Sequence, residues 1–199
     1  MMVKICGVTR SEDAQAAVAA GAQAIGFIFW AGSPRQVSVG QARRITRDVP
    51  AFVTTVGVFV NQSLEEIEET AAAAGLSAVQ LHGDEDRGFA SRLSRPTIKA
   101  VSHQLEQAKD WPSSVTLLVD AFDPQRRGGT GQKADWTAAA RLARERRIVL
   151  AGGLNAENVA AAIRQVRPFG IDVSSGVESA PGLKDHGKIR ALFQAVQVL

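Results

Sequence analysis

The segment DAQAAVAAGAQAIGFIF, residues 13–29, decides the fold that this chain is expected to adopt. An alanine-rich stretch ends at Gly21, and a short apolar run follows at residues 24–29. Glycine just past a helix supplies a left-handed C-cap, so this order predicts a helix, a stop and a strand. The order recurs in IEETAAAAGLSAVQLHG (residues 67–83), and VAAAIRQVRPFGIDVSSG (residues 159–176) resembles both. A repeated helix–strand unit is therefore expected along the chain.

Eight short apolar runs are candidate strands, near residues 2–6, 24–29, 54–60, 78–82, 97–101, 115–120, 147–151 and 170–174. The runs are nearly continuous rather than alternating, which is typical of parallel strands buried on both faces. Helical segments separate most of them, although SHQLEQAKDWPSS (residues 102–114) has room for only a short helix. Capping-box spacing predicts helix starts at Thr9, Ser38 and Ser63.

Eight such units predict an α/β fold, a (β/α)₈ TIM barrel. An open doubly wound sheet is the alternative, but no G-x-G-x-x-G follows the first run, which disfavours it. We see no linker, low-complexity segment or break in composition, and we therefore expect one barrel domain over residues 1–199.

Composition limits the classes of function. The formal net charge is +3, which fits ordinary solvated helix faces or a small anionic ligand. The basic residues are scattered and aromatic platforms are missing, so we expect no nucleic-acid partner. One cysteine excludes an internal disulfide and a four-cysteine zinc site. Without a leader or an 18-residue apolar stretch, we expect a cytoplasmic protein that does not enter a membrane.

Polar residues at strand ends are the candidates for chemistry, because barrel active sites lie at the carboxyl ends of the strands. Cys6 ends the first run and is either a small buried hydrophobe or a reactive thiol. Asp120 ends the sixth run, VTLLVD, where an unpaired buried carboxylate is costly, and its ordinary role would be a loop cap.

Three further polar residues follow the second and fourth runs. Arg35 in WAGSPR is either a surface arginine or a fork that binds a carboxylate through two hydrogen bonds. Gln80 and His82 end the fourth run, and the ordinary role of His82 would be a hydrogen bond to a neighbouring loop.

Glycine-rich loops after the late strands predict a phosphate site. RGGTGQ (residues 127–132), LAGGLN (150–155) and DVSSGVE (172–178) fall in the last third of the chain. Backbone N–H groups at glycines form anion-binding nests, and a phosphate site after strands seven and eight recurs in barrels. The alternative is that these glycines only reverse the chain. The candidate residues are Gly129, Gly131, Gly152, Gly153, Ser174, Ser175 and Gly176, with Asp172 beside them.

The ordered motifs resemble the phosphoribosylanthranilate isomerase family of tryptophan biosynthesis over almost the whole chain. They are KICGVT, GFIF with SPRQV, VGVFVN, QLHGDE, LLVDA, GGTG, LAGGLN with ENV, and DVSSGVE with PGLKD. The resemblance implies a (β/α)₈ barrel enzyme that needs no metal or organic cofactor. It implies an Amadori rearrangement of N-(5-phosphoribosyl)anthranilate to 1-(2-carboxyphenylamino)-1-deoxyribulose 5-phosphate by a monomer or homodimer.

The resemblance also implies roles for individual residues. Cys6 matches the family's general base, Asp120 its general acid, and Arg35 the arginine that holds the anthranilate carboxylate. The glycine loops and Ser174–Gly176 match the phosphate site, and we assign Gln80, His82 and Asp172 to substrate binding. As a base, Cys6 needs thiolate character and hence a positive or hydrogen-bonding setting. Lys4, two residues earlier, points the same way on an alternating strand and either contributes or pairs with a charge near the other end of the barrel.

Two other functions stay open at this point. The histidine-pathway sugar isomerase also performs an Amadori rearrangement, but it is longer and has an aspartate where this chain has Cys6. A non-catalytic phosphosugar-binding barrel would be expected to lack Cys6, Asp120 or Arg35, and all three are present.

Overall fold

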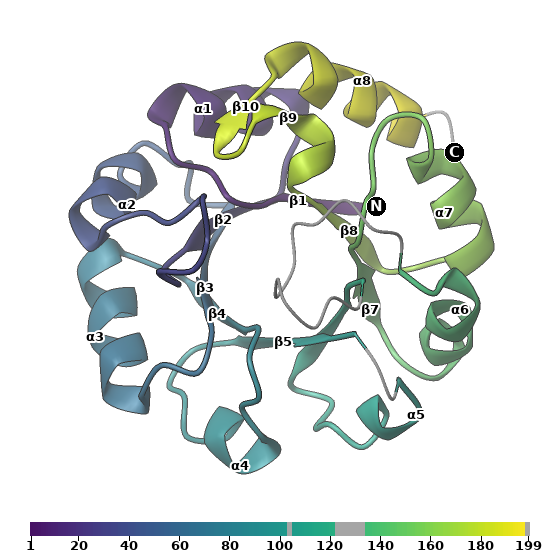
Figure 1. The fold of residues 1–199 in the computed structure, drawn as a ribbon, viewed down its shortest axis with the longest axis horizontal. Helices are drawn as coiled ribbons and strands as arrows, with labels where there is room; N and C mark the ends of the chain where they lie inside the picture. Colours follow the sequence, from purple (N-terminus) through teal and green to yellow (C-terminus); the bar gives the residue numbers. More distant parts are fainter. Residues whose placement is uncertain (103–104, 122–133, 198–199) are drawn as a thin grey trace.

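The computed structural model describes residues 1–102, 105–121 and 134–197. Eight parallel strands form a closed barrel in chain order, and seven of the helices connect them in succession (Figure 1). The strands are β1 Met2–Ile5, β2 Ala24–Ile28, β3 Thr54–Phe59, β4 Ala78–Leu81, β5 Thr97–Val101, β6 Thr116–Val119, β7 Ile148–Leu150 and β8 Gly170–Val173. The helices are α1 Ser11–Ala20, α2 Val39–Thr46, α3 Leu64–Ala74, α4 Arg87–Ala90, α5 Leu105–Ala108, α6 Trp136–Glu145, α7 Val159–Val166 and α8 His186–Gln197.

The barrel confirms the predicted fold and rules out the open sheet. Strand β1 pairs with β2 on one side and with β8 on the other, which closes the sheet. Each strand lies within a residue or two of its predicted range, because continuous apolar runs mark strands buried on both faces. The weak gap between β5 and β6 holds only the four-residue helix α5, as expected.

Helix ends follow the predicted signals in most places. Gly21 and Gly75 end α1 and α3 with φ of 109° and 70°, the left-handed region that glycine adopts without strain. Ser38 and Ser63 each accept a hydrogen bond from the backbone N–H three residues later, as N-caps do. Helix α7 instead ends at Arg167 with φ of 53°, immediately before a proline.

The predicted cap at Thr9 is wrong. The residue preceding α1 is Arg10, which makes no side-chain cap. The Thr9 hydroxyl donates instead to the carbonyl of Gly182, with 2.6 Å between the oxygens. The hydroxyl of Thr9 thus bonds a residue 173 positions away instead of capping the adjacent helix, as the local pattern had predicted.

The core has two parts. The larger part lies between the barrel and its surrounding helices. Inside the barrel, small clusters fill the space with residues that include Ala24, Val56, Leu118 and Val149. Side chains two positions further along these strands face the same interior, so the residues near the carboxyl ends of the strands line the mouth.

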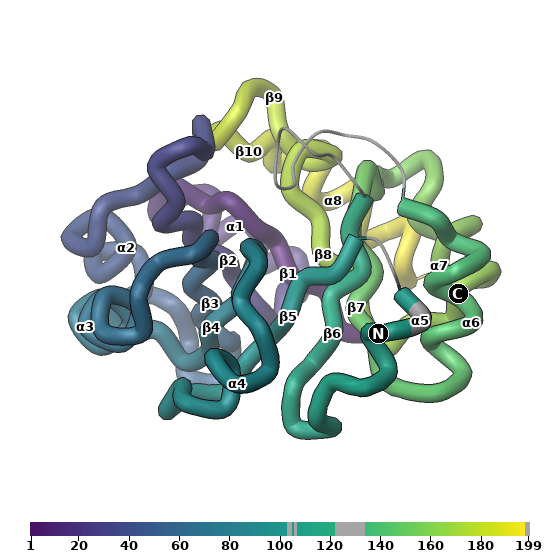
Figure 2. The backbone as a smooth tube through the Cα atoms, turned by 60° about the horizontal axis from the view of Figure 1, so that its bottom comes forward, coloured from purple at the N-terminus to yellow at the C-terminus, as the bar shows by residue number. Residues whose placement is uncertain are grey.

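A short hairpin covers one side of this mouth. After β8, a 3₁₀ turn (η1, Ser175–Val177) leads into β9 Glu178–Ala180 and β10 Leu183–Lys184, which pair antiparallel. Figures 1 and 2 show the hairpin at the carboxyl end of β8, beside α1. The backbone N–H of Lys184 donates to the buried carboxylate of Asp13 on α1, at 3.2 Å. The hairpin thus joins the last strand of the barrel to its first helix.

Candidate active site

Polar side chains gather inside the carboxyl end of the barrel, where the sequence predicts the site. Register places them on one face: Lys4 pairs with Ala24 and with Asp172, and Val58 pairs with Gln80. Because alternate residues share a face, the side chains next along these strands also face the mouth. The polar side chains on the strands are Lys4 of β1, Gln80 of β4 and Asp172 of β8, and those that directly follow β1, β4, β6 and β8 are Cys6, His82, Asp120 and Ser174.

Cys6 lies directly after β1 and is buried. Its backbone N–H donates to the carbonyl of Val173 on β8, at 2.9 Å. Gly26 on β2 makes room for the thiol: a Cβ at that position would lie 2.8 Å from Cys6 Sγ and 3.1 Å from Lys4 Cε. The interior face of β2 must therefore carry a glycine here for the cysteine to keep its place.

The charges around Cys6 differ from the expectation. Lys4 Nζ donates to Asp172 Oδ2 at 2.9 Å, and both side chains are almost fully buried. Burial raises the pKa of the Cys6 thiol, and the nearby ammonium groups of Lys4 and Lys184 offset that rise only in part. The net shift is upward, so in the free protein the thiol form dominates at neutral pH. The expected positive setting is present, but the expected shift toward thiolate is not.

The ion pair between Lys4 and Asp172 also shifts the pKa values of both side chains. Burial lowers the pKa of Lys4, but the carboxylate of Asp172 outweighs it, so the net shift is upward. Burial raises the pKa of Asp172, and the charge of Lys4 opposes that rise. Lys4 therefore stays charged and pairs across one strand boundary, at the level of the site and not at the other end of the barrel.

Gln80, His82 and Asp120 form a chain across the mouth. Gln80 Nε2 lies 2.9 Å from His82 Nδ1, and His82 Nε2 lies 3.4 Å from Asp120 Oδ2. Asp120 Oδ1 accepts the backbone N–H of Ala121 at 2.8 Å. Asp120 thus does cap its own loop with one oxygen while the other faces His82. The predicted contact of His82 with a neighbouring loop is replaced by a contact with its own strand and with Asp120.

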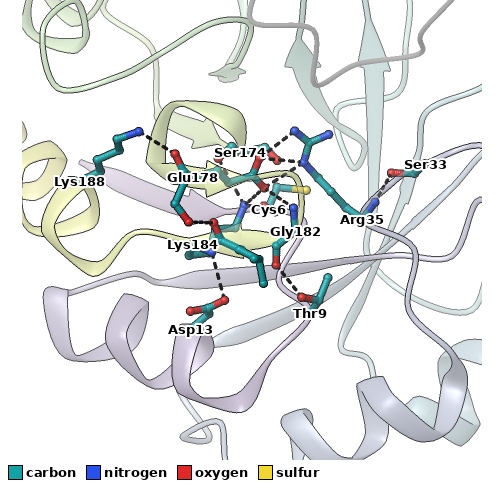
Figure 3. Close-up of polar contacts among 12 residues, drawn as sticks. Cys6, Thr9, Asp13, Ser33, Arg35, Ser174, Glu178, Gly182, Lys184 and Lys188 are labelled. Atoms are coloured by element: carbon teal, nitrogen blue, oxygen red, sulfur yellow. Dashed lines mark hydrogen bonds and ion pairs between the residues drawn. The ribbon is translucent and has the colours of Figure 1, made fainter.

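Arg35 is buried, so the reading of it as a surface arginine is wrong. Its Nε lies 2.9 and 3.1 Å from the two carboxylate oxygens of Glu178, and its Nη2 lies 2.8 Å from Oε2. Figure 3 shows Glu178 between Arg35 and Lys184. We predicted no role for Glu178 or Lys184, although both stand in the motifs DVSSGVE and PGLKD.

The loops after β7 and β8 lie against each other. Gly152 and Gly153 have φ of 82° and 61°, and a Cβ at Gly176 would lie 1.9 Å from the carbonyl oxygen of Leu154. Glycine is therefore required at these positions by backbone conformation or by close approach. Gly129 and Gly131, predicted for the same phosphate site, lie outside the described residues.

Three buried polar atoms at the mouth have no hydrogen-bond partner among the residues that the structure describes. They are Gln80 Oε1, Asp172 Oδ1 and Ser174 Oγ. Buried polar atoms of folded proteins are nearly always satisfied, by protein, water or ligand. All three belong to residues that the sequence assigns to substrate or phosphate, so the arrangement is that of a polar ligand site.

Other features of the described part of the chain do not compete with this site. No group of three or more His, Cys, Asp or Glu side chains there is arranged to hold a metal ion. None of the helices in the described ranges is long and apolar enough to cross a membrane. An open groove of about 640 Å³ is lined by residues that include Lys109, Trp111, Arg147 and Phe169, and it contains no predicted site residue.

Comparisons with known proteins agree with the geometry. The family model described as N-(5'-phosphoribosyl)anthranilate (PRA) isomerase matches residues 3–195. A curated protein named N-(5'-phosphoribosyl)anthranilate isomerase from Pelobacter propionicus is 51% identical over 195 residues, covering 96% of this chain and 93% of its own.

Two solved structures extend the similarity to three dimensions. A phosphoribosyl anthranilate isomerase in complex with reduced 1-(o-carboxyphenylamino)-1-deoxyribulose 5-phosphate is 41% identical, with a TM-score of 0.88 and full coverage of both chains. Monomers of the dimeric phosphoribosylanthranilate isomerase from Thermotoga maritima are 39% identical, with a TM-score of 0.90 and full coverage of both. With the family model matching nearly every residue, this chain belongs to the N-(5'-phosphoribosyl)anthranilate isomerase family.

Proposed function

We propose that this chain converts N-(5-phosphoribosyl)anthranilate to 1-(2-carboxyphenylamino)-1-deoxyribulose 5-phosphate in tryptophan biosynthesis. Its membership of the isomerase family supports this activity. The observation that carries the proposal is the mouth of the barrel. There Cys6 and Asp120 directly follow strands β1 and β6, beside three buried polar atoms that have no partner among the described residues. A phosphorylated small molecule with several hydroxyl groups would satisfy such atoms.

Asp120 acts first, as the general acid. Its protonated carboxyl donates to the ring oxygen of the ribose, the bond from that oxygen to C1 breaks, and the nitrogen lone pair forms an iminium. Oδ2 faces His82 at 3.4 Å, and His82 is itself held by Gln80. The carboxylate left on Asp120 therefore has a polar neighbour already in place.

Cys6 acts second, as the general base. The thiolate takes the proton from C2, the C–H electron pair forms the C1–C2 double bond, and the iminium electrons return to nitrogen. The resulting enolamine tautomerises to the ketose, and the overall reaction consumes no proton. Because burial raises the pKa of the Cys6 thiol, the reacting form is a minor one in the free protein at neutral pH.

The remaining predicted residues bind the substrate. Arg35 receives the anthranilate carboxylate, and the loops after β7 and β8 receive the phosphate through backbone N–H groups and Ser174 Oγ. Support for the phosphate site comes from the close contact of these loops and from the hydroxyl of Ser174, which has no partner in the described part of the chain. Gln80, His82 and Asp172 contact the sugar, since two of them carry oxygens that no described residue satisfies.

Four properties remain predictions: the location, the absence of a cofactor, the absence of a nucleic-acid partner and the oligomeric state. We expect a cytoplasmic enzyme that needs no metal or organic cofactor and binds no nucleic acid. We expect a monomer or a homodimer, because a relative from Thermotoga maritima is described as dimeric and as monomers. Sedimentation of the purified chain at several concentrations would decide between the two states.

The deciding experiment follows anthranilate fluorescence with phosphoribosylanthranilate generated in situ, on the wild type, Cys6→Ser and Asp120→Asn. We expect turnover in the wild type and a loss of about 100-fold or more in each variant, the usual scale of general acid–base catalysis. An inactive wild type would leave a phosphosugar-binding barrel as the function. Turnover of the aminoimidazole ribotide substrate of histidine synthesis would show that the chain also serves that pathway.

A further inference from the structure

We propose that Glu178, held by Lys184, is a positioning residue that aims Arg35 at the carboxylate of the substrate. This inference rests on the proposed function, and it assigns a task to two buried charges that the reaction itself does not use. Both lie on the β9–β10 hairpin, outside the barrel strands.

The geometry fixes which edge of Arg35 is occupied. Its Nε and Nη2 both point at the carboxylate of Glu178, within 3.1 Å, and both side chains are buried. Among the described residues, Nη1 donates no hydrogen bond. A guanidinium is planar, so a carboxylate that grips one edge also sets the direction of the other edge. The carboxylate of Glu178 thus orients the donor that is left for a ligand.

Glu178 is itself held in place by a fully buried ammonium. Lys184 Nζ lies 2.7 Å from Glu178 Oε1, 2.6 Å from the carbonyl of Cys6 and 3.3 Å from the carbonyl of Ser174. An ammonium has three protons, and here each has an acceptor. One side chain therefore ties the anchor of Arg35 to the loop that carries the base and to the loop predicted to bind phosphate, as Figure 3 shows.

The charge balance suits an anionic ligand. Burial lowers the pKa of Lys184, and the carboxylate of Glu178 opposes that fall. With Lys184 protonated, Arg35 and Lys184 carry two positive charges and Glu178 one negative charge, which leaves one positive charge for a carboxylate to neutralise. Burial raises the pKa of Glu178, but the hydrogen bonds and charges of Arg35 and Lys184 outweigh it, so Glu178 stays ionised at neutral pH. Without Glu178, neither of these two buried cations would contact a carboxylate of the described residues.

The side chain of Arg35 also packs against the backbone of Gly7. Gly7 has φ of 72°, and a Cβ at that position would lie 2.6 Å from Arg35 Cδ. The stem of the arginine therefore lies across the loop after β1, and Glu178 holds its head. The position of the guanidinium depends on these two contacts more than on its own flexible chain.

The test compares two product analogues that differ by one group: reduced 1-(2-carboxyphenylamino)-1-deoxyribulose 5-phosphate and the same molecule without the carboxyl. Dissociation constants are measured by calorimetry on the wild type, Glu178→Gln, Glu178→Asp, Arg35→Met and the double variant Glu178→Gln with Arg35→Met. We expect the wild type to prefer the carboxylated analogue by about tenfold or more, the scale of a charge-assisted hydrogen bond.

In Glu178→Gln the preference should fall to about one although the local positive charge rises, because the guanidinium of Arg35 loses its orientation. The affinity for the carboxyl-free analogue should change by less than about threefold. Glu178→Asp, which keeps the charge but displaces it, should give an intermediate preference. This variant replaces Glu178→Gln in the test if the glutamine variant does not fold. Adding Glu178→Gln to Arg35→Met should change nothing further, because the effect passes through the arginine.

Glu85→Gln is the matched control, because Glu85 is also buried and pairs with a lysine, Lys99, at 2.9 Å. The Glu85→Gln variant should prefer the carboxylated analogue as strongly as the wild type does, even if the substitution lowers its stability. Parallel weakening of both analogues in Glu178→Gln, an unchanged preference, or an equal loss in Glu85→Gln would each overturn the inference. Failure of the proposed function would be seen separately, as a wild type that does not turn over phosphoribosylanthranilate.

Discussion

Substitution of Gly26 should disable the enzyme without unfolding it. In Gly26→Ala the new Cβ would lie 2.8 Å from Cys6 Sγ, while ordinary contacts begin at 3.4 Å, so the thiol must move by about 0.6 Å, the difference 3.4 − 2.8. The backbone Cα of Cys6, at 3.2 Å, limits the space on that side. Overpacking of this kind costs about 1–3 kcal/mol of folding stability.

The effect on catalysis should be larger than the effect on stability. A misplacement of about 1 Å near a reacting group can cost on the order of 100-fold, so a shift of this size should lower kcat about tenfold or more. KM should change little, because the proposed role of the thiol is to abstract a proton and not to hold the substrate.

The assay is steady-state turnover of phosphoribosylanthranilate, with urea unfolding measured in parallel. Gly40→Ala is the control, since Gly40 is exposed on α2 and a Cβ there meets only the end of Arg44, at 3.8 Å. It should retain full activity and gain slight stability, because alanine favours a helix. A folded Gly26→Ala variant with kcat within about twofold of the wild type would refute the reasoning.

Three further predictions concern charge. The Cys6 thiol should ionise at a pH above its ordinary value of 9.0, because burial raises its pKa. Its thiolate absorbance, taken as the difference between the wild type and Cys6→Ser, can be titrated without interference because the chain has no tyrosine, and a midpoint below 8 would contradict the shift. Because the folded-state pKa of Glu178 lies below its unfolded value of 4.5, its contribution to stability is present above that pH and is lost as the pH falls through the folded pKa. Urea midpoints of Glu178→Gln should therefore fall less steeply than those of the wild type on acidification below 4.5, and parallel curves would count against this. Lys4→Met should cost about 3–5 kcal/mol by leaving Asp172 buried without its partner, and adding Asp172→Leu should restore most of it in urea unfolding; a cost under 1 kcal/mol would contradict the pairing.

Local patterns predicted the barrel because its elements are locally encoded. Runs such as residues 54–60 and 115–120 are apolar on both faces wherever helices cover them, and Gly21 and Gly75 mark helix ends by a conformation that other residues avoid. The predicted strands also indicated where the candidate site would lie, since polar residues at the carboxyl ends of parallel strands meet at one mouth.

Contacts between segments that are distant in the sequence could not be predicted from local patterns. Glu178 and Arg35 are 143 positions apart, and Lys184 and Cys6 are 178 positions apart. The Thr9 cap failed for the same reason, since its hydroxyl is taken by Gly182. The upward shift of the Cys6 pKa also depends on burial in the folded barrel, which the residues next to Cys6 in the sequence do not predict. Which charges pair is decided by closure of the barrel.

The contact of Lys184 with the carbonyl of Cys6 also has a consequence for biosynthesis. The residue proposed as the base leaves the ribosome 178 residues before the ammonium that holds its loop. Strand β1 likewise waits for β8 before its second edge is paired. A nascent chain or a premature termination product that ends before residue 184 can fold part of the sheet, but it lacks the ammonium that holds the loop of Cys6. Catalysis should therefore begin only after Lys184 has been synthesised and has joined the loop of Cys6.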